Sequence, residues 1–258
     1  MRVSIITACY NRAATVAEAI ESVAAQTHDD IEHIVVDGGS TDGTLDVLAR
    51  RRASLAKLIP GPDEGIYDAL NKGVAAATGD IVGFLHSDDV YARDDIIATV
   101  AERMQSASLD ALYGDVAFVP PDDTGRIVRV YSSRRFHPSR IARGWMPAHP
   151  ALFLRRAVYG RYGAFKTDYH IAADFEFIAR IFSAGRLRYA YLPQVLVKMR
   201  LGGVSTRGWR STLTLNREVL RACRENGIAT SYFKILSRYP EKLLEFVVRP
   251  GAGAQERR

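Results

Sequence analysis

The sequence has 258 residues, of which 47% are hydrophobic and 25% are charged. This composition is typical of a soluble globular protein with one large domain, or one domain and an appendage. The net charge of +6 and the isoelectric point of about 9.4 favour an anionic partner, such as a nucleotide or an acidic membrane surface. The basic residues are scattered and form no reader motif, which argues against nucleic acid as the partner.

Cysteine usage and hydropathy bear on the location of the protein. Cys9 and Cys223 lie far apart, so we expect neither a disulfide framework nor a metal-binding cysteine set. No signal-peptide pattern precedes the first apolar run, and no run approaches the roughly 18 residues of a transmembrane helix. The sequence therefore predicts a cytoplasmic protein.

The first hundred residues alternate between short apolar runs and amphipathic segments. Strands are expected at residues 3–8, 31–36, 55–59 and 81–85. A helix carrying Val16, Ala19, Ile20 and Val23 on one face should follow the first strand, and further helices are expected at 44–52, 66–77 and 94–106. This βαβα order predicts a parallel sheet with right-handed crossovers.

After residue 106 the pattern becomes mixed. Two strand-like runs, joined by a loop rich in Pro, Asp and Gly, predict a hairpin. In chain order we expect strands at 110–119 and 126–132, an irregular stretch at 144–154, helices at 155–162 and 173–184, strands at 187–191 and 195–199, and helices from 209 onward. The tail at 251–258 is expected to be disordered.

The fourth predicted strand ends in the polar sequence His86, Ser87, Asp88, Asp89. In open α/β sheets ligands bind beyond the carboxyl ends of the strands. Two adjacent carboxylates there suit Mg²⁺ or Mn²⁺, which usually also takes oxygens from a phosphate. The alternative is a plain turn in which Asp89 or Asp94 caps the next helix.

Asp37 ends the second predicted strand and should lie at the same sheet edge. Its carboxylate could accept hydrogen bonds from a nucleobase or a ribose hydroxyl, or it could serve only the turn with Gly38 and Gly39. This turn lacks the spaced glycines of a dinucleotide fingerprint and follows the second strand, which argues against NAD binding.

Four segments in the first ninety residues carry motifs: IITACYNR at residues 5–12, VVDGGSTDGT at 35–44, GIYDALNKGVAAATGD at 65–80 and LHSDD at 85–89. In combination they resemble glycosyltransferase family 2, the large inverting group with the GT-A fold. Residues 35–44, VVDGGSTDGT, look like its VVDxGSxDGT signature, and residues 5–12 look like its opening strand and turn. Residues 65–80 resemble its G-x-x-x-A-x-N-x-G…A-x-G-D segment, and residues 85–89, LHSDD, stand where the family has D-x-D. The motifs keep the family's order and spacing, and the likeness continues more loosely to about residue 205.

The resemblance implies a fold and a domain plan. The fold would be α/β of the GT-A type, with a Rossmann-like, mostly parallel sheet flanked by helices. A transferase domain would span 1–205, with a nucleotide-binding half at 1–106 and an acceptor half at 107–205. A helical extension at 206–250 and the tail at 251–258 would follow.

The resemblance also implies donor contacts. The expected nucleotide-binding residues are Thr7, Tyr10, Asn11, Asp37, Ser40, Asn71, Ser87 and Asp88. Asp88 matches the acid that coordinates the metal on the donor diphosphate, and Asp89 is expected to assist it. His86 departs from the pattern, since the family usually has an aspartate there. It could contact the ribose, or it could pack as a neutral side chain against the site.

An inverting transfer needs a base to remove the acceptor hydroxyl's proton. Residues 172–180 resemble the family's segment with Asp174 at the base position, and the alternative is that Asp174 only caps this helix. Glu176 lies about 200° further around the helix and should point elsewhere. By resemblance, His149 would line the acceptor or diphosphate side, unless it is a structural histidine. Arg200, with the glycine-rich residues Gly202, Gly203, Val204 and Ser205 after it, looks like the mobile basic loop that closes over the donor diphosphate in relatives, unless it is a plain surface arginine.

The region between residues 232 and 248 mixes apolar side chains with Lys234, Arg238 and Lys242. Basic amphipathic helices of this kind lie on anionic membranes, although Pro240 would divide the run into two short helices. We expect either peripheral association with the inner face of the cell membrane or helices packed on the domain.

Together these features predict an inverting glycosyltransferase. It would move a sugar from a nucleoside-diphosphate sugar, a UDP-sugar above all, to a hydroxyl of a glycan or lipid-linked acceptor in cell-surface polysaccharide or glycolipid assembly. One alternative is a sugar nucleotidyltransferase, but residues 10–13 do not resemble its Gly-rich phosphate loop. Another is a non-catalytic sugar-nucleotide or glycan-binding module, against which an intact acid at Asp174 argues.

Overall fold

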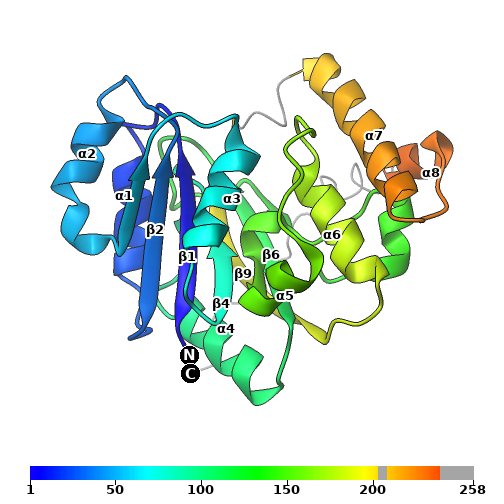
Figure 1. Ribbon diagram of the computed structural model, residues 1–258, viewed down its shortest axis with the longest axis horizontal. Helices are drawn as coiled ribbons and strands as arrows, with labels where there is room; N and C mark the ends of the chain where they lie inside the picture. The colour runs from blue at the N-terminus through cyan, green and yellow to red at the C-terminus, as the bar shows by residue number, and fades with distance from the viewer. Residues whose placement is uncertain (203–207, 239–258) are drawn as a thin grey trace.

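The computed structural model describes residues 1–202 and 208–238, and it is built around one mixed sheet (Figure 1). The strand order is β3-β2-β1-β4-β8-β6-β9-β5, with β7 paired to β6. The strands are β1 Val3–Cys9, β2 Ile31–Asp37, β3 Lys57–Pro60, β4 Ile81–Phe84, β5 Val90–Tyr91, β6 Ala111–Val119, β7 Arg129–Tyr131, β8 Leu152–Arg155 and β9 Tyr189–Arg200. The first four are parallel, and β8 runs antiparallel to both of its neighbours.

Helices cover both faces of the sheet (Figure 1). The α-helices are α1 Val16–Ala24, α2 Thr44–Arg50, α3 Ile66–Ala76, α4 Ile96–Ser106, α5 Arg156–Tyr162, α6 Ala173–Ser183, α7 Gly208–Glu225 and α8 Tyr232–Leu236. Short 3-10 helices are η1 Arg52–Ser54, η2 Pro138–Arg143 and η3 His149–Ala151. Ile6 of β1 belongs to the same buried cluster as side chains of α3 and α6, whereas Ile5 belongs to the cluster that includes those of α4. Since successive strand residues face opposite sides, the apolar run of β1 serves two cores and confirms the predicted α/β architecture.

The C-terminal helices share the core of the second half of the chain. Val219 and Cys223 of α7 and Ile235 of α8 are buried in the same cluster as the apolar face of α6. The outer side of α8 exposes Tyr232 and Phe233, the latter to 88%. Residues 203–207 and 239–258, which include the predicted tail and most of the predicted membrane segment, lie outside the described residues.

Two predicted features of the second half differ from the structure. Residues 144–154, expected to be irregular, end in β8, which lies between β4 and β6. The two short strands expected at 187–191 and 195–199 form one strand, β9, with a register shift opposite Asp115. A buried strand of four residues, such as β8, shows no alternation of apolar and polar residues that would reveal it. Pro193 lies within β9, and in the sequence a proline indicates the end of a strand. The predicted hairpin is confirmed by the antiparallel pairing of β6 and β7.

Within the described ranges, none of the helices combines the length and the apolar character that crossing a bilayer demands. Cys9 and Cys223 are both buried free thiols.

Candidate active site

A cavity of about 640 Å³ opens where the parallel strands end. Its walls come from distant parts of the chain: the turn after β1, the loop before α3, the turn after β4, the loop before α6, and the end of β9. This is the sheet edge at which the sequence places the predicted ligand site. Among the predicted site residues, those that line it are Tyr10, His86, Ser87, Asp88, Asp89, His149, Asp174 and Arg200.

Three other predicted residues shape the turns beside the cavity. The Asp37 carboxylate is fully buried and accepts hydrogen bonds from Gly39 N at 3.0 Å, Ser40 N at 2.9 Å and the Ser40 hydroxyl at 2.6 Å. Ser40 Oγ accepts from Asn11 N at 2.8 Å, and Asn11 Oδ1 accepts from Thr41 N at 2.9 Å. Asp37, Ser40 and Asn11 therefore join the turn after β1 to the turn after β2, and their side chains do not line the cavity.

Thr7 and Asn71 also lie behind the cavity wall. Thr7 is fully buried, with its Oγ1 3.0 Å from His33 Nε2. Asn71 of α3 donates to Phe165 O at 2.8 Å and accepts from Phe165 N at 2.9 Å. These bonds tie β1 to β2, and α3 to the loop before α6. Tyr10, by contrast, is 58% exposed and lines the cavity.

The acid pair after β4 places two carboxylates in different surroundings. Asp88 is partly exposed, with its Oδ2 3.9 Å from Arg12 Nε. Asp89 is buried; its Oδ1 accepts from Arg200 N at 3.3 Å, and its Oδ2 has no hydrogen-bond partner among residues 1–202 and 208–238. Burial, followed by the charge of Asp88, raises the pKa of Asp89 well above its usual value.

These carboxylates fit a divalent cation. The orphaned Asp89 Oδ2 is a buried oxygen that a cation would satisfy, and the Asp88 carboxylate lines the same cavity. Within residues 1–202 and 208–238, no cluster of three or more His, Cys, Asp or Glu side chains could hold a metal alone. A cation here would thus depend on oxygens from a diphosphate and water, the usual arrangement for Mg²⁺ with phosphates.

Arg200 is a buried brace, not the free cation that the sequence predicts. Its Nε donates to Pro121 O at 2.9 Å, one terminal nitrogen donates to Asp88 O at 2.6 Å, and the other pairs with Glu18 of α1. These bonds join the turn that carries Asp88 and Asp89, the acid turn, to α1 and to the loop after β6. Of the loop expected to follow it, Gly203, Val204 and Ser205 lie outside the described residues. The cation that faces Asp88 is Arg12, which the sequence reasoning did not single out.

Two neutral histidines lie at the floor of the cavity. His149 stacks on Phe84 with ring centroids 4.9 Å apart, and the ring of His86 is 6.2 Å away. Burial lowers the pKa of His86 and lowers that of His149 to about 3. Both imidazoles are therefore uncharged at neutral pH.

Asp174 is the second residue of α6 and faces the cavity. Its Oδ1 accepts from Phe175 N at 2.7 Å and lies 3.4 Å from the Tyr67 hydroxyl, which also donates to Ile171 O. Burial raises the pKa of Asp174 to about 6. A carboxylate that titrates near neutrality suits a general base.

Glu176, two residues further along α6, is fully buried. Its carboxylate pairs with Arg180 at 2.8 Å and with Lys166 at 3.1 Å. Glu176 does not line the cavity, whereas Asp174 does, so the two carboxylates point in different directions as the helical geometry predicts. Tyr67 and His170, by contrast, do line the cavity, and sequence reasoning missed them because no local pattern links either residue to Asp174.

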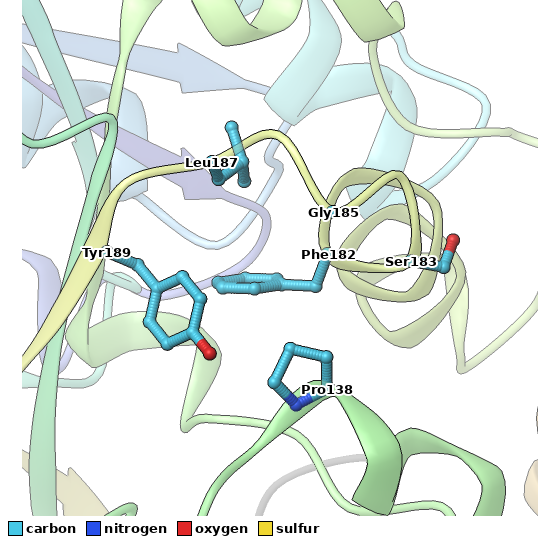
Figure 2. A pocket seen from close by; sticks show the side chains of 6 residues that line it. All are labelled: Pro138, Phe182, Ser183, Gly185, Leu187 and Tyr189. Atoms are coloured by element: carbon cyan, nitrogen blue, oxygen red, sulfur yellow. The ribbon is translucent and has the colours of Figure 1, made fainter.

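A second cavity, of about 400 Å³, lies at the other end of α6. It is lined by Pro138, Phe182, Ser183, Gly185, Leu187 and Tyr189 (Figure 2). The rings of Phe182 and Tyr189 meet edge to face, 5.2 Å apart, and Figure 2 shows the Ser183 hydroxyl pointing away from them. This lining has no carboxylate, imidazole or cation, so the chemistry belongs to the first cavity.

Known proteins resemble this chain in sequence. The family described as "Glycosyl transferase family 2" matches residues 4–162. A "PGL/p-HBAD biosynthesis glycosyltransferase" of Mycobacterium bovis (strain BCG / Pasteur 1173P2) is 34% identical over 207 residues, which cover 78% of each chain. An "Uncharacterized glycosyltransferase" of Mycobacterium tuberculosis (strain ATCC 25618 / H37Rv) is 34% identical over 181 residues, covering 69% of this chain and 68% of the relative.

Solved structures share the fold. S. aureus TarS 1-349 in complex with UDP-GlcNAc has a TM-score of 0.72 at 20% identity, covering 95% of this chain and 73% of its own. A longer TarS chain is covered over 43% of its length. The mannosyltransferase PcManGT from Pyrobaculum calidifontis, in complex with GDP-Man and Mn2+, has a TM-score of 0.61 at 25% identity, covering 92% and 68%. With the sequence match across more than half of its length and this GT-A fold, the chain belongs to glycosyl transferase family 2 and is a glycosyltransferase.

Proposed function

We propose that the protein transfers a sugar from a nucleoside-diphosphate sugar to a hydroxyl acceptor with inversion at the anomeric carbon. The observation that carries the proposal is one cavity that holds both a cation-competent acid pair, Asp88 and Asp89, and a carboxylate of raised pKa, Asp174. The acid pair would hold the cation that binds the donor diphosphate, and Asp174 would accept the proton of the acceptor hydroxyl.

The nucleotide half would bind the donor. The exposed ring of Tyr10 offers a stacking surface for a base, and Arg12 offers a guanidinium to the diphosphate. We propose a UDP-sugar as donor, with support from TarS, which was solved with UDP-GlcNAc; PcManGT was solved with GDP-Man. Asp37, Ser40, Asn11, Thr7 and Asn71 would act indirectly, by shaping the walls.

Mg²⁺ or Mn²⁺ would be held by Asp88 with the assistance of Asp89. When bound, such a cation offsets negative charge on the departing diphosphate. The Arg12 guanidinium would offset further negative charge on the diphosphate, because its Nε lies 3.9 Å from Asp88 Oδ2, beside the proposed cation site. The Mn2+ bound with GDP-Man in PcManGT supports a divalent cation in this family.

Asp174 would act as the base. It would accept the proton of the acceptor hydroxyl while that oxygen bonds to the anomeric carbon and the bond to the diphosphate breaks. A pKa of about 6 leaves most of the carboxylate ionised at pH 7 and still able to hold a proton. Neutral His86 and His149 would line the sugar side of the cavity.

We place the acceptor among glycans or lipid-linked sugars of cell-surface polysaccharide or glycolipid assembly. The exposed Tyr232, Phe233 and Leu236 of α8, with Lys234 between them, support peripheral association with the inner face of the cell membrane. The proposed domain plan keeps the transferase domain at 1–205 and the helical extension at 206–250.

The test is donor turnover. The full-length chain is incubated with UDP-glucose, UDP-GlcNAc or GDP-mannose, with Mn²⁺ or with EDTA, and the nucleoside diphosphate released is measured. We expect one donor to turn over in Mn²⁺ only, and proton NMR to show the inverted anomer as the first product. A nucleotide that stabilises the fold while no donor turns over would favour a non-catalytic binding module.

A further inference from the structure

The loop that leads into α6 is held by a carboxylate of α7. Glu218 Oε1 accepts from His170 N at 2.8 Å, and Oε2 accepts from Ile171 N at 2.9 Å and Ala172 N at 2.8 Å. Glu218 is 8% exposed. One buried side chain thus binds three consecutive peptide groups, and a charged acceptor makes such bonds strong.

These three peptides lie directly before the proposed base. Ala172 is the N-cap residue of α6, and its side chain makes no capping bond, so the loop is anchored from α7 instead. Asp174 follows two residues later. The Ile171 carbonyl also accepts the Tyr67 hydroxyl, which lies 3.4 Å from Asp174. Glu218 therefore fixes both the backbone that carries the base and the carbonyl that orients its tyrosine neighbour.

We propose that Glu218 is a positioning residue for catalysis: it holds residues 170–172 so that the Asp174 carboxylate faces the acceptor hydroxyl. This inference rests on the proposed role of Asp174 as base. Small displacements matter for such a group, since a shift of about 1 Å costs on the order of 10²-fold in rate.

The charge of Glu218 gives the proposal a second readout. Two titratable side chains act on Asp174: the Tyr67 hydroxyl of α3 lowers the pKa of Asp174, and the Glu218 carboxylate of α7 raises it, while burial has the largest effect. Removing the negative charge in Glu218→Gln should lower the pKa of Asp174. A carboxylate without electrostatic contact with Asp174 would leave the pH profile unchanged.

Glu225 provides a matched control on the same helix. Its carboxylate accepts from the side chains of Lys166 at 2.7 Å, Tyr169 at 3.0 Å and Arg221 at 2.6 Å, so it also holds the loop before α6. None of its described bonds reaches the backbone of residues 170–172. Glu225→Gln therefore weakens the attachment of α7 without touching the peptides that lead into Asp174.

The experiment compares wild type, Glu218→Gln, Glu225→Gln and Asp174→Asn, each as the full chain. The readouts are the thermal shift caused by UDP with Mn²⁺, and the pH profile of donor hydrolysis with the best of UDP-glucose, UDP-GlcNAc and GDP-mannose. For Glu218→Gln we expect an unchanged UDP shift, a kcat lowered roughly 10- to 100-fold and an acid limb moved to lower pH. Glu225→Gln should keep the wild-type kcat and acid limb.

Two outcomes would overturn the proposal: wild-type kcat and pH profile in Glu218→Gln, or an equal loss in Glu225→Gln. If Asp174→Asn still turns over donor at the wild-type rate, the base assignment itself is wrong, which separates the two failures. Should Glu218→Gln not fold, Glu218→Asp takes its place, because it keeps the charge but is one methylene too short. It should lower kcat and leave the acid limb in place, and a wild-type kcat would again overturn the proposal.

Discussion

The acid turn after β4 and the start of α6 both bring carboxylates to one cavity. The side chain that holds the acid turn is a cation, whereas the side chain that holds the start of α6 is an anion. The Arg200 side chain donates to the Asp88 carbonyl, and the Arg200 backbone N–H donates to Asp89. Glu218 binds three N–H groups before Asp174. The cation opposes the rise in the pKa of Asp89, whereas the anion adds to the rise in the pKa of Asp174. The two effects agree with the proposed roles, in which Asp89 assists a bound cation and Asp174 takes up a proton.

The strongest test of this comparison is to remove the proposed base, Asp174, alone. Asp174→Asn keeps a side-chain oxygen for Phe175 N but cannot take a proton. We expect donor turnover to fall by about 10²- to 10⁴-fold, with nucleotide affinity unchanged because the acid turn is intact. Steady-state kinetics with the preferred donor checks this, and a loss of less than tenfold would remove Asp174 from the base position.

Removing the cationic brace should affect stability first. Arg200→Met leaves the carbonyls of Asp88 and Pro121 and the carboxylate of Glu18 without this partner. We expect the free energy of unfolding to fall by about 2 kcal/mol, measured by urea denaturation. The control is Arg93→Met, an exposed residue paired with Asp95, which should change it by less than about 0.5 kcal/mol. Equal effects in the two variants would show that Arg200 is not a brace.

Arg12 lines the cavity beside Asp88. In the proposed site it contacts the donor diphosphate, so its loss should weaken donor binding without unfolding the protein. We expect Arg12→Met to raise the donor KM by about tenfold, the effect of one charge-assisted hydrogen bond, with little change in kcat. A larger change in kcat than in KM would place Arg12 in the chemical step instead.

The smallest effect concerns the acceptor side. Since the pKa of Asp174 is raised to about 6, the base is active above that pH, and kcat/KM should fall tenfold per pH unit below it. The Tyr67 hydroxyl lowers this pKa, so Tyr67→Phe should move the acid limb to higher pH. A pH–rate profile of both proteins checks the direction, and a shift to lower pH would contradict the proposed contact.

The strand-end residues could be predicted because they depend on local sequence. Asp37 and Asp88 both follow buried apolar runs, and parallel strands bring their carboxyl ends to one edge. The separation of Asp174 from Glu176 also followed from helical geometry alone. The prediction of Asp174 as the base came from the resemblance to the family's motifs, because the periodicity of apolar residues carries no information about it.

The braces could not be predicted, because they join residues far apart in the sequence. Arg200 pairs with Glu18 over 182 positions, and Tyr67 reaches Asp174 over 107. An arginine before a glycine-rich loop is compatible with a free cation or a buried one, and only the packing decides. Thr7, likewise, became a buried partner of His33 because β1 lies beside β2.

The most direct test of the account is a comparison of nucleotide binding in two variants. The thermal midpoint is measured for Asp88→Ala and Asp174→Asn with UDP, GDP or dTDP, each with Mn²⁺ or EDTA; a ligand that binds the native state raises the midpoint. The account predicts Mn²⁺-dependent stabilisation by one nucleotide in Asp174→Asn, as in wild type, and its loss in Asp88→Ala. Stabilisation that survives in Asp88→Ala, or that disappears in Asp174→Asn, would contradict the division of the cavity into a cation-binding side and a base side.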